Sequence, residues 1–303
     1  MSRRLTAFVL AGGGNLGAIQ VGMLQALLEA EIEPDLIVGS SVGALNGAFL
    51  AERPTMDRVE ALGQLWRNLR RRDIFPFRPA RLASGLARRR SHFFDPDRFR
   101  SFLAGVNLGF GRLEAATVPL HVVATDLASG RPVVLSTGTV IDALVASAAL
   151  PRFFPPVEVA GRYLIDGGVA ADTPIAQAAA LGATQIYVLP TFPNSAQPTP
   201  GQPTPGQPTP GQPSLLLKAA RVVMGLRDGA SSPQPQTAVP VHVLPVPAGP
   251  LPSMFDFTQT GVLMARGLAE TRRWLARESA RPWTPATRGP GRSPAPHRLQ
   301  PAG

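Results

Sequence analysis

The 303-residue chain has no cysteine. Its absence excludes disulfides, thiolate zinc sites and a cysteine nucleophile. Histidine is scarce as well, with only four residues in the chain, which argues against a metal centre built from several histidines. We therefore expect neither a metal ion nor an organic cofactor.

Long apolar runs are also missing, and none approaches the roughly 20 residues that cross a bilayer. The apolar run from Leu5 to Ala11 follows Arg3 and Arg4, as in a signal peptide. It is barely long enough for a signal-peptide core, however, and it leads directly into glycines that have another use. The sequence therefore predicts a cytoplasmic protein.

Lysine is nearly absent, because Lys218 is the only one, and the formal net charge of +10 comes from arginine. A basic surface attracts anionic lipid or nucleic acid. A GC-rich genome would raise the arginine, alanine, glycine and proline content together and give the same charge. Both explanations stay open, and peripheral contact with an anionic membrane is one consequence of the first.

Short apolar runs alternate with runs of helical periodicity along the chain, and several of the strands end at tight glycine turns. Strands are expected at 5–11, 36–38, 119–125, 133–135, 162–165, 185–189 and 241–244, and helices at 16–30, 42–51, 140–150, 175–181 and 259–278. This alternation favours an α/β sandwich with a mainly parallel central sheet.

Composition divides the chain into a core and several irregular pieces. The Gln-Pro-Thr-Pro-Gly repeat at 197–213 offers no apolar face and few backbone donors, so it should not join a sheet or helix. The tail is rich in proline, arginine and glycine and resembles disordered sequence. We expect a catalytic core at 1–190 that includes a basic, phenylalanine-rich cap or insertion at 66–100, a flexible insertion at 191–239, a return to the core at 240–280, and a disordered basic tail at 281–303.

A glycine-rich loop, Gly12-Gly13-Gly14-Asn15-Leu16-Gly17, lies between the first strand and the first helix. It fits the dinucleotide-binding pattern, in which backbone amides hold a pyrophosphate. That interpretation needs an acidic residue at the end of the second strand, but Asp35 precedes that strand. The same amides suit an oxyanion hole, with Gly12, Gly13, Gly14, Asn15 and Gly17 as its candidates. A tight turn with no other role is a third interpretation.

The sequence Gly39-Ser40-Ser41-Val42-Gly43 follows the second strand and precedes a helix. It fits Gly-x-Ser-x-Gly, the nucleophile elbow, in which Gly39 and Gly43 allow a sharp turn that exposes the Ser41 hydroxyl. Ser40 does not fit, because Val38 and Val42 stand where that frame needs glycine. Asp166-Gly167-Gly168 follows the strand at 162–165, and the Asp166 carboxylate could accept the serine proton.

Together these motifs resemble the patatin-like phospholipases. The resemblance covers roughly residues 5–190 and rests on the glycine loop, the elbow, the stretch from Ala146 to Pro156, and Asp166-Gly167-Gly168, with Ala124-Thr125-Asp126-Leu127 as a further similar segment. It implies a three-layer α/β/α fold and a Ser-Asp dyad that needs no histidine. Ser41 would be acylated by a lipid or fatty-acyl ester, Asp166 would be its base, and no nucleic acid partner is expected.

One position departs from the family pattern. The family usually carries arginine or lysine in the glycine loop where this chain has Leu16. The change leaves the backbone amides in place, but it affects substrate placement or loop stability.

Two other interpretations remain open. The chain order Ser41, Asp166, His242 matches the Ser-Asp/Glu-His order of the α/β-hydrolase triad. Against this, His242 lies inside the apolar run at 241–244, where a structural histidine is more common than a catalytic one. A catalytically weak nucleotide-binding or regulatory module is the other alternative, and it rests on the glycine loop and on Leu16.

Overall fold

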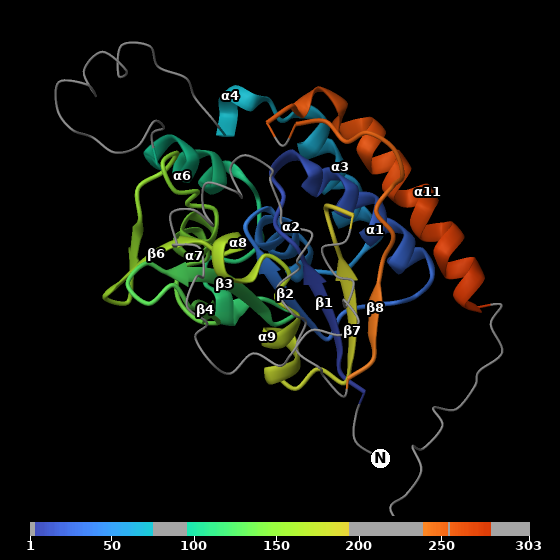
Figure 1. Cartoon of the computed structure of the whole chain (residues 1–303), viewed down its shortest axis with the longest axis horizontal. Helices are drawn as coiled ribbons and strands as arrows, with labels where there is room; N and C mark the ends of the chain where they lie inside the picture. Colours follow the sequence, from blue (N-terminus) through green and yellow to red (C-terminus); the bar gives the residue numbers. More distant parts are fainter. Residues whose placement is uncertain (1–3, 75–95, 194–238, 254, 280–303) are drawn as a thin grey trace, which may run out of the picture.

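A computed structural model of the chain describes residues 4–74, 96–193, 239–253 and 255–279. Its centre is one sheet, in which hydrogen-bonded neighbours follow the order β5-β6-β3-β2-β1-β7-β8, with β4 paired to β3 (Figure 1). The strands are β1 (Thr6–Leu10), β2 (Leu36–Ser40), β3 (Leu120–Asp126), β4 (Pro132–Leu135), β5 (Val157–Val159), β6 (Arg162–Asp166), β7 (Gln185–Leu189) and β8 (Val241–Val243).

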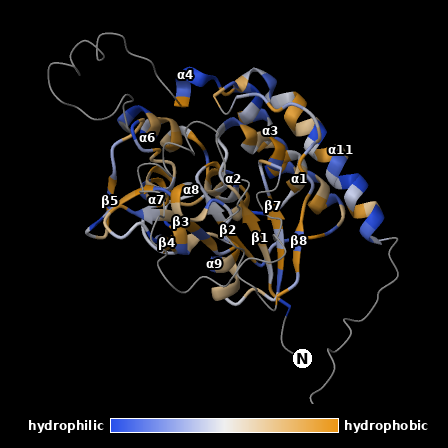
Figure 2. Cartoon of the chain, in the orientation of Figure 1, coloured by the Kyte–Doolittle hydropathy of each residue, from blue (hydrophilic) through white to orange (hydrophobic). Residues whose placement is uncertain are grey.

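Five of these strands, β3, β2, β1, β7 and β8, run parallel, whereas β4, β5 and β6 pair antiparallel with their neighbours. The parallel strands are short and strongly apolar, as expected where helices cover both faces (Figure 2). The mainly parallel sheet predicted from the sequence is confirmed, with an antiparallel region added beside β3.

Helices cover both faces of this sheet. They are α1 (Gly17–Glu29), α2 (Val42–Ala51), α3 (Met56–Asn68), α4 (Arg71–Ile74), α6 (Pro96–Gly105), α7 (Val140–Ser147), α8 (Gly168–Ala171), α9 (Ile175–Ala180) and α11 (Thr260–Ser279), with short 3-10 turns η1 (Gly14–Leu16), η2 (Leu113–Ala115) and η3 (Phe257–Gln259). No helix in the described ranges has the length and apolar character needed to cross a membrane.

The side chains of β1 show how the layers form. Phe8 and Leu10 pack into a large cluster with residues of α1, α2, α3 and α11, whereas Ala7 and Val9 pack on the other face with Ile175 of α9. Successive strand residues point to opposite faces, so each strand contributes to both cores. The three-layer α/β/α sandwich expected from the sequence is confirmed.

The first and last described helices, α1 and α11, pack closely side by side (Figure 1). A Cβ atom on Gly22 of α1 would lie 2.5 Å from the backbone nitrogen of Leu268. A Cβ on Gly267 of α11 would overlap the carbonyl oxygen of Ile19. The glycines therefore let the two backbones approach to direct contact, and α11 joins the core as predicted.

Several element boundaries differ from the sequence-based expectation. Trp66, predicted to open the basic insertion, belongs to the core helix α3 and is only 4% exposed. Phe99, near the end of that segment, is also buried. The helix expected at 140–150 ends at Ser147, because the chain then turns so that the carbonyl of Ala149 can accept a hydrogen bond from the backbone of Asp166. Strand β5 and helices α3, α4, α6 and α8 were not predicted.

Candidate active site

Ser41 lies at the sharp junction between β2 and α2. Its backbone has φ 53° and ψ −124°, a conformation that a residue with a side chain rarely adopts, and α2 begins at the next residue. The Ser41 backbone amide donates to the hydroxyl of Ser147 (2.8 Å), which in turn donates to the carbonyl of Val123 (2.6 Å). Ser41 therefore stands at a sharp turn from strand to helix, and Ser147 holds its backbone in place.

Asp166 comes to Ser41 because the ends of two strands meet along one edge of β3. Strand β2 pairs with β3 as far as Ser40, which is opposite Val123, and β6 pairs with β3 from Asp166, which is opposite Ala124. Strand β4 pairs with both of these stretches of β3 and therefore occupies one edge of β3 along its length. Strands β2 and β6 must then share the opposite edge of β3. The residue that follows β2 therefore lies beside the residue that ends β6.

The two side chains are in direct contact. The Ser41 hydroxyl donates to Asp166 Oδ2 over 2.7 Å, and the backbone amide of Gly168 donates to Asp166 Oδ1 over 2.7 Å. Asp166 is only 1% exposed. Its two oxygens are thus divided between the serine and a backbone donor, which fixes the carboxylate in hydrogen-bond reach of the hydroxyl.

Two residues that each follow a predicted strand of a mainly parallel sheet are expected to meet at its carboxyl edge. This is not how Asp166 meets Ser41, because β6 runs antiparallel to β3. Asp166 reaches the site because β6 ends level with the end of β2. The direction of a strand depends on the connection before it, here the hairpin of β5 and β6, which the sequence-based reasoning did not include.

The glycine loop lies against Ser41, and Gly12, Gly13 and Gly14 line the same pocket. The amide of Gly12, however, donates to the carbonyl of Asp172 (3.0 Å). The amide of Gly17 donates to the carbonyls of Gly14 and Asn15. These two amides are already committed within the protein, which leaves Gly13 and Gly14 as the pocket-lining candidates for an oxyanion hole.

The side chains of Asn15 and Leu16 make other contacts within the protein. Asn15 is fully buried, and its side-chain amide donates to the carbonyl of Asp256. Leu16 is also fully buried and packs in the main hydrophobic cluster. The position at which the family usually carries a basic residue is thus filled by a core side chain.

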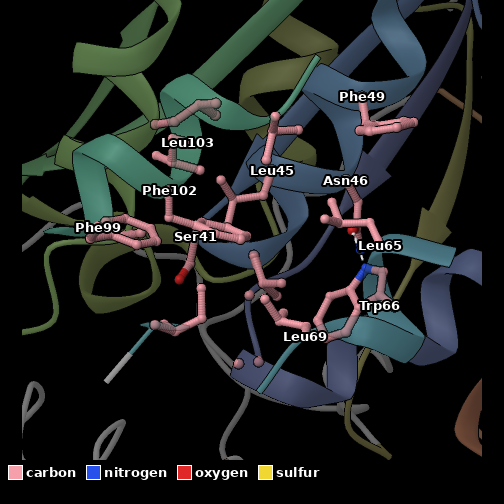
Figure 3. Close-up of a pocket in the computed structure, with 18 of the residues that line it drawn as sticks. Ser41, Leu45, Asn46, Phe49, Leu65, Trp66, Leu69, Phe99, Phe102 and Leu103 are labelled. Carbon is pink, nitrogen blue, oxygen red and sulfur yellow. Dashed lines mark hydrogen bonds between the residues drawn. The ribbon is translucent and has the colours of Figure 1, made fainter. Parts of the chain in front are cut away.

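A mainly apolar pocket extends from Ser41 and is partly open to solvent. Figure 3 shows Leu45 and Phe49 of α2, Leu65 and Trp66 of α3, and Phe99, Phe102 and Leu103 of α6 around it, with Ser41 at one side. Asp166 and Asp172 are the charged residues among its lining. The cavity suits a flexible apolar chain whose polar end lies at Ser41.

A buried polar network supports the apolar wall. Asn46 donates to Gln20 Oε1 and to the carbonyl of Gly17, both over 2.9 Å, and accepts from the indole nitrogen of Trp66 over 2.9 Å (Figure 3). Gln20 donates to the carbonyls of Ala11 (2.8 Å) and Leu189 (2.9 Å). The network thus joins α1, α2 and α3 to the strand ends and to the glycine loop.

Several of these residues were missed in the sequence-based reasoning. Gln20 and Asn46 look like ordinary helix residues, and only their position inside apolar runs could have marked them. Ser147 stands in the stretch from Ala146 to Pro156 that carries the resemblance, but no role was assigned to it. Asp172 has a clearer signal, because it lies one short helix beyond Asp166.

His242, the candidate third member of a triad, lies on β8 and packs against aromatic side chains. Its ring stacks on Tyr187 (centroids 4.8 Å apart) and meets Trp274 edge-on at 6.4 Å. Burial lowers its pKa from the usual 6.5. Ser41 bonds directly to Asp166 instead, with no imidazole between them. Burial also lowers the pKa of His121, which bonds to Ser136 over 2.7 Å.

Asp35 does not lie where a dinucleotide-binding site would need an acidic residue. The Asp35 carboxylate accepts from the amide of Thr6 (2.8 Å), at the start of β1, whereas the glycine loop follows the other end of that strand. Among the described residues, no three acidic or histidine side chains gather in a way that could hold a metal ion.

Several predictions fall on residues outside the described ranges. They are the proline repeat at 197–213, most of the basic insertion at 66–100 with Arg88, Arg89 and Arg90, and the tail at 281–303. His92 and His297 also lie outside these ranges.

Residues 8–179 match the family model described as "Patatin-like phospholipase". The chain is 29% identical over 194 residues to "Lysophospholipase nte1" of Aspergillus terreus, which covers 61% of this chain and 12% of that protein. It is 32% identical over 178 residues to an uncharacterised NTE family protein of Mycobacterium tuberculosis, which covers 58% of this chain and 46% of that protein. The chain thus spans less than half of the length of either relative.

Two solved structures are also similar. VipD from Legionella pneumophila shares 16% sequence identity at a TM-score of 0.37, covering 61% of this chain and 49% of that one. The ExoU–SpcU complex from Pseudomonas aeruginosa shares 16% identity at a TM-score of 0.39, covering 91% and 52%. The fold assignment rests on the topology of the chain itself.

Proposed function

The chain belongs to the patatin-like phospholipase family, and on that premise we propose that it is a serine-dependent lipid acyl hydrolase with a Ser41–Asp166 dyad. The family supports a lipid hydrolase. The observation that carries the finer assignment is the 2.7 Å hydrogen bond from the Ser41 hydroxyl to Asp166 Oδ2, two residues that line an apolar pocket.

The reaction proceeds as two acyl transfers. Asp166 accepts the Ser41 proton while Ser41 Oγ attacks the ester carbonyl, and the leaving alcohol departs with a proton returned from Asp166. A water molecule, deprotonated by the same carboxylate, then attacks the acyl-serine carbonyl. The bond from the acyl carbon to Ser41 Oγ breaks, Asp166 returns the proton to Ser41 Oγ, and the fatty acid leaves. These steps require no metal ion or organic cofactor.

The negative charge on the carbonyl oxygen needs nearby donors, and we assign this role to the amides of Gly13 and Gly14. Both residues line the pocket beside Ser41. The α2 helix begins directly after Ser41, so the positive end of its dipole adds to the stabilisation. Gly12, Asn15 and Gly17, which the sequence also nominated, serve to position this loop.

The substrate class follows from the lining of the pocket. Leucine and phenylalanine side chains of α2, α3 and α6 surround the space next to Ser41 and favour a fatty-acyl chain. One relative carries the name lysophospholipase, which is consistent with such a substrate. Peripheral contact with an anionic membrane, the absence of a nucleic acid partner and a cytoplasmic location remain predictions from the sequence.

The proposal is tested with the purified chain and a series of fatty-acyl esters that differ in chain length, with free fatty acid as the readout. Ser41→Ala and Asp166→Asn should each lower kcat by orders of magnitude, because each removes one half of a unit that acts on a single proton. A fluorophosphonate should label the wild-type chain at Ser41 and should not label Ser41→Ala.

His242→Ala is the matched control. Its ring contacts Tyr187 and Trp274, so the substitution should cost packing and leave kcat nearly unchanged. Circular dichroism should show that every variant is folded. A folded but inactive His242→Ala, together with substantial activity in Asp166→Asn, would replace the dyad with the triad.

A further inference from the structure

A second pocket adjoins the first and differs from it in charge. The two share a wall formed by Leu69 and Phe257. The second pocket is also lined by Arg70, Arg71, Ser253, Phe255, Asp256 and Thr258. We call it the Arg70–Arg71 pocket.

Arg70 and Arg71 give the lining of this pocket its positive charge. Both arginines are exposed, whereas the first pocket has Asp166 and Asp172 as its charged lining residues. Asp73, on the same short helix as Arg71, accepts from the backbone amide of Arg70 (2.9 Å) and does not line the pocket. A negatively charged group bound where the two pockets meet would therefore find its countercharge in the Arg70–Arg71 pocket.

Asp256 is the one acidic residue in this lining, and its carboxylate already has local partners. Asp256 Oδ1 accepts from the amide and the hydroxyl of Thr258, over 2.9 Å and 2.6 Å. These bonds lower the pKa of Asp256, so it is charged at neutral pH. Two arginines against one aspartate leave the lining with a net positive charge.

Two contacts connect the Arg70–Arg71 pocket to the glycine loop and to the wall of the first pocket. The Asn15 side chain, next to Gly14, donates to the carbonyl of Asp256. Phe257 stacks on Trp66, with ring centroids 6.3 Å apart and an interplanar angle of 15°. The segment that forms one side of the Arg70–Arg71 pocket is therefore attached to the loop that borders Ser41.

We propose that Arg70 and Arg71 bind the phosphate of a glycerophospholipid whose acyl chain occupies the first pocket, and so select phosphoester lipids over neutral lipids. The inference rests on the proposed function. Guanidinium groups form strong charge-assisted hydrogen bonds with phosphate oxygens. In a glycerophospholipid the short glycerol backbone separates the ester from the phosphate, so the two groups can occupy adjacent pockets.

The test compares two substrates with the same acyl chain, a lysophosphatidylcholine and the corresponding monoacylglycerol. Both are presented in the same neutral detergent micelles at fixed salt. The double variant Arg70→Gln/Arg71→Gln should lower kcat/KM for the lysophospholipid by about tenfold or more, mainly through KM, because it removes charge-assisted hydrogen bonds to the phosphate. Its kcat/KM for the monoacylglycerol should stay within about twofold of the wild type.

The matched control is Arg131→Gln/Arg162→Gln, which removes the same charge from exposed residues outside both pockets. It should leave the ratio between the two substrates unchanged. An equal effect of the Arg70/Arg71 variant on both substrates, or no effect on the lysophospholipid, would overturn the inference. A wild-type chain that hydrolyses neither substrate would instead refute the proposed function.

A free phosphate ion could use the same chemistry, and calorimetry with inorganic phosphate and the Ser41→Ala chain separates the two sources. Weak phosphate binding together with a selective loss of lysophospholipid hydrolysis supports the lipid head group. Tight phosphate binding that disappears in the Arg70/Arg71 variant, with lysophospholipid hydrolysis intact, would assign the pocket to a free anion.

Discussion

Asn46→Ala should destabilise the protein strongly, although the hydrogen bonds of its side chain go to Gly17, Gln20 and Trp66 and not to the proposed dyad. Asn46 is 1% exposed. Its removal leaves two buried groups without this partner, the indole N–H of Trp66 and Gln20 Oε1. The carbonyl of Gly17 lies in the first turn of α1 and keeps an intrahelical acceptor role. At about 1–3 kcal/mol for each orphaned group, the free energy of unfolding should fall by about 2–6 kcal/mol.

Urea unfolding followed by circular dichroism measures this loss, and the melting temperature should fall by about 10 °C, at roughly 2–4 °C per kcal/mol. Asn68→Ala, on the exposed side of α3, is the control and should change stability by less than about 0.5 kcal/mol. A double-mutant cycle with Trp66→Phe should give a coupling energy of about 1 kcal/mol or more, because the phenyl ring has no N–H to orphan. A loss below about 1 kcal/mol for Asn46→Ala, or an additive cycle, would refute the reasoning.

Three further perturbations test other parts of the molecule. Gly43→Ala should lower the free energy of unfolding in chemical denaturation by about 3 kcal/mol or more, because the new Cβ would lie 2.6 Å from the backbone oxygen of Ala11 and overlap that of Leu10. Gly105→Ala, with open space around it, should cost nothing, and equal losses would contradict this explanation. His242→Phe should weaken the pH dependence of unfolding: the folded pKa is lowered, so the wild type loses stability as the pH falls below 6.5 and the unfolded chain takes up the proton first. Urea midpoints at pH 7.5 and 5 measure how stability changes with pH in each protein, and the same change in the variant and the wild type would contradict this prediction. Deletion of residues 198–212 should leave melting temperature and activity nearly intact, since β7 and β8 stay joined by far more than the dozen or so residues that a parallel crossover needs. A large fall in melting temperature would mean that the segment packs against the rest of the protein.

The local sequence was sufficient to predict the strand–turn–helix junctions. The runs before Gly12 and before Ser41 are short and apolar, and glycines follow each of them, so the elements and the turns could be placed within a few residues. Helix α2 was predicted with the same bounds that the structure shows. A junction of this kind depends on residues that are close in the chain.

The remaining features depend on residues that are distant in the chain. Nothing within 162–166 determines that β6 runs antiparallel to β3, because the direction follows from the hairpin with β5. The partners of Asn46 lie on α1 and α3, so its burial could not be seen in the pattern of α2 alone. The hydrogen bond from the Gly12 amide to the Asp172 carbonyl likewise joins two segments that become neighbours only once the sheet has formed.

The close packing of α1 against α11 has a consequence for synthesis on the ribosome. Helix α1 is synthesised before α11, which packs against it so closely that Gly22 and Gly267 bring the two backbones into contact. Until α11 follows, the apolar surface of α1 that it covers is exposed to other nascent chains, as is typical of domains closed by long-range contacts. The glycine loop leads directly into α1. Helix α11 therefore both covers this apolar surface and supports the helix that follows the glycine loop, so the same contact serves folding and the shape of the pocket.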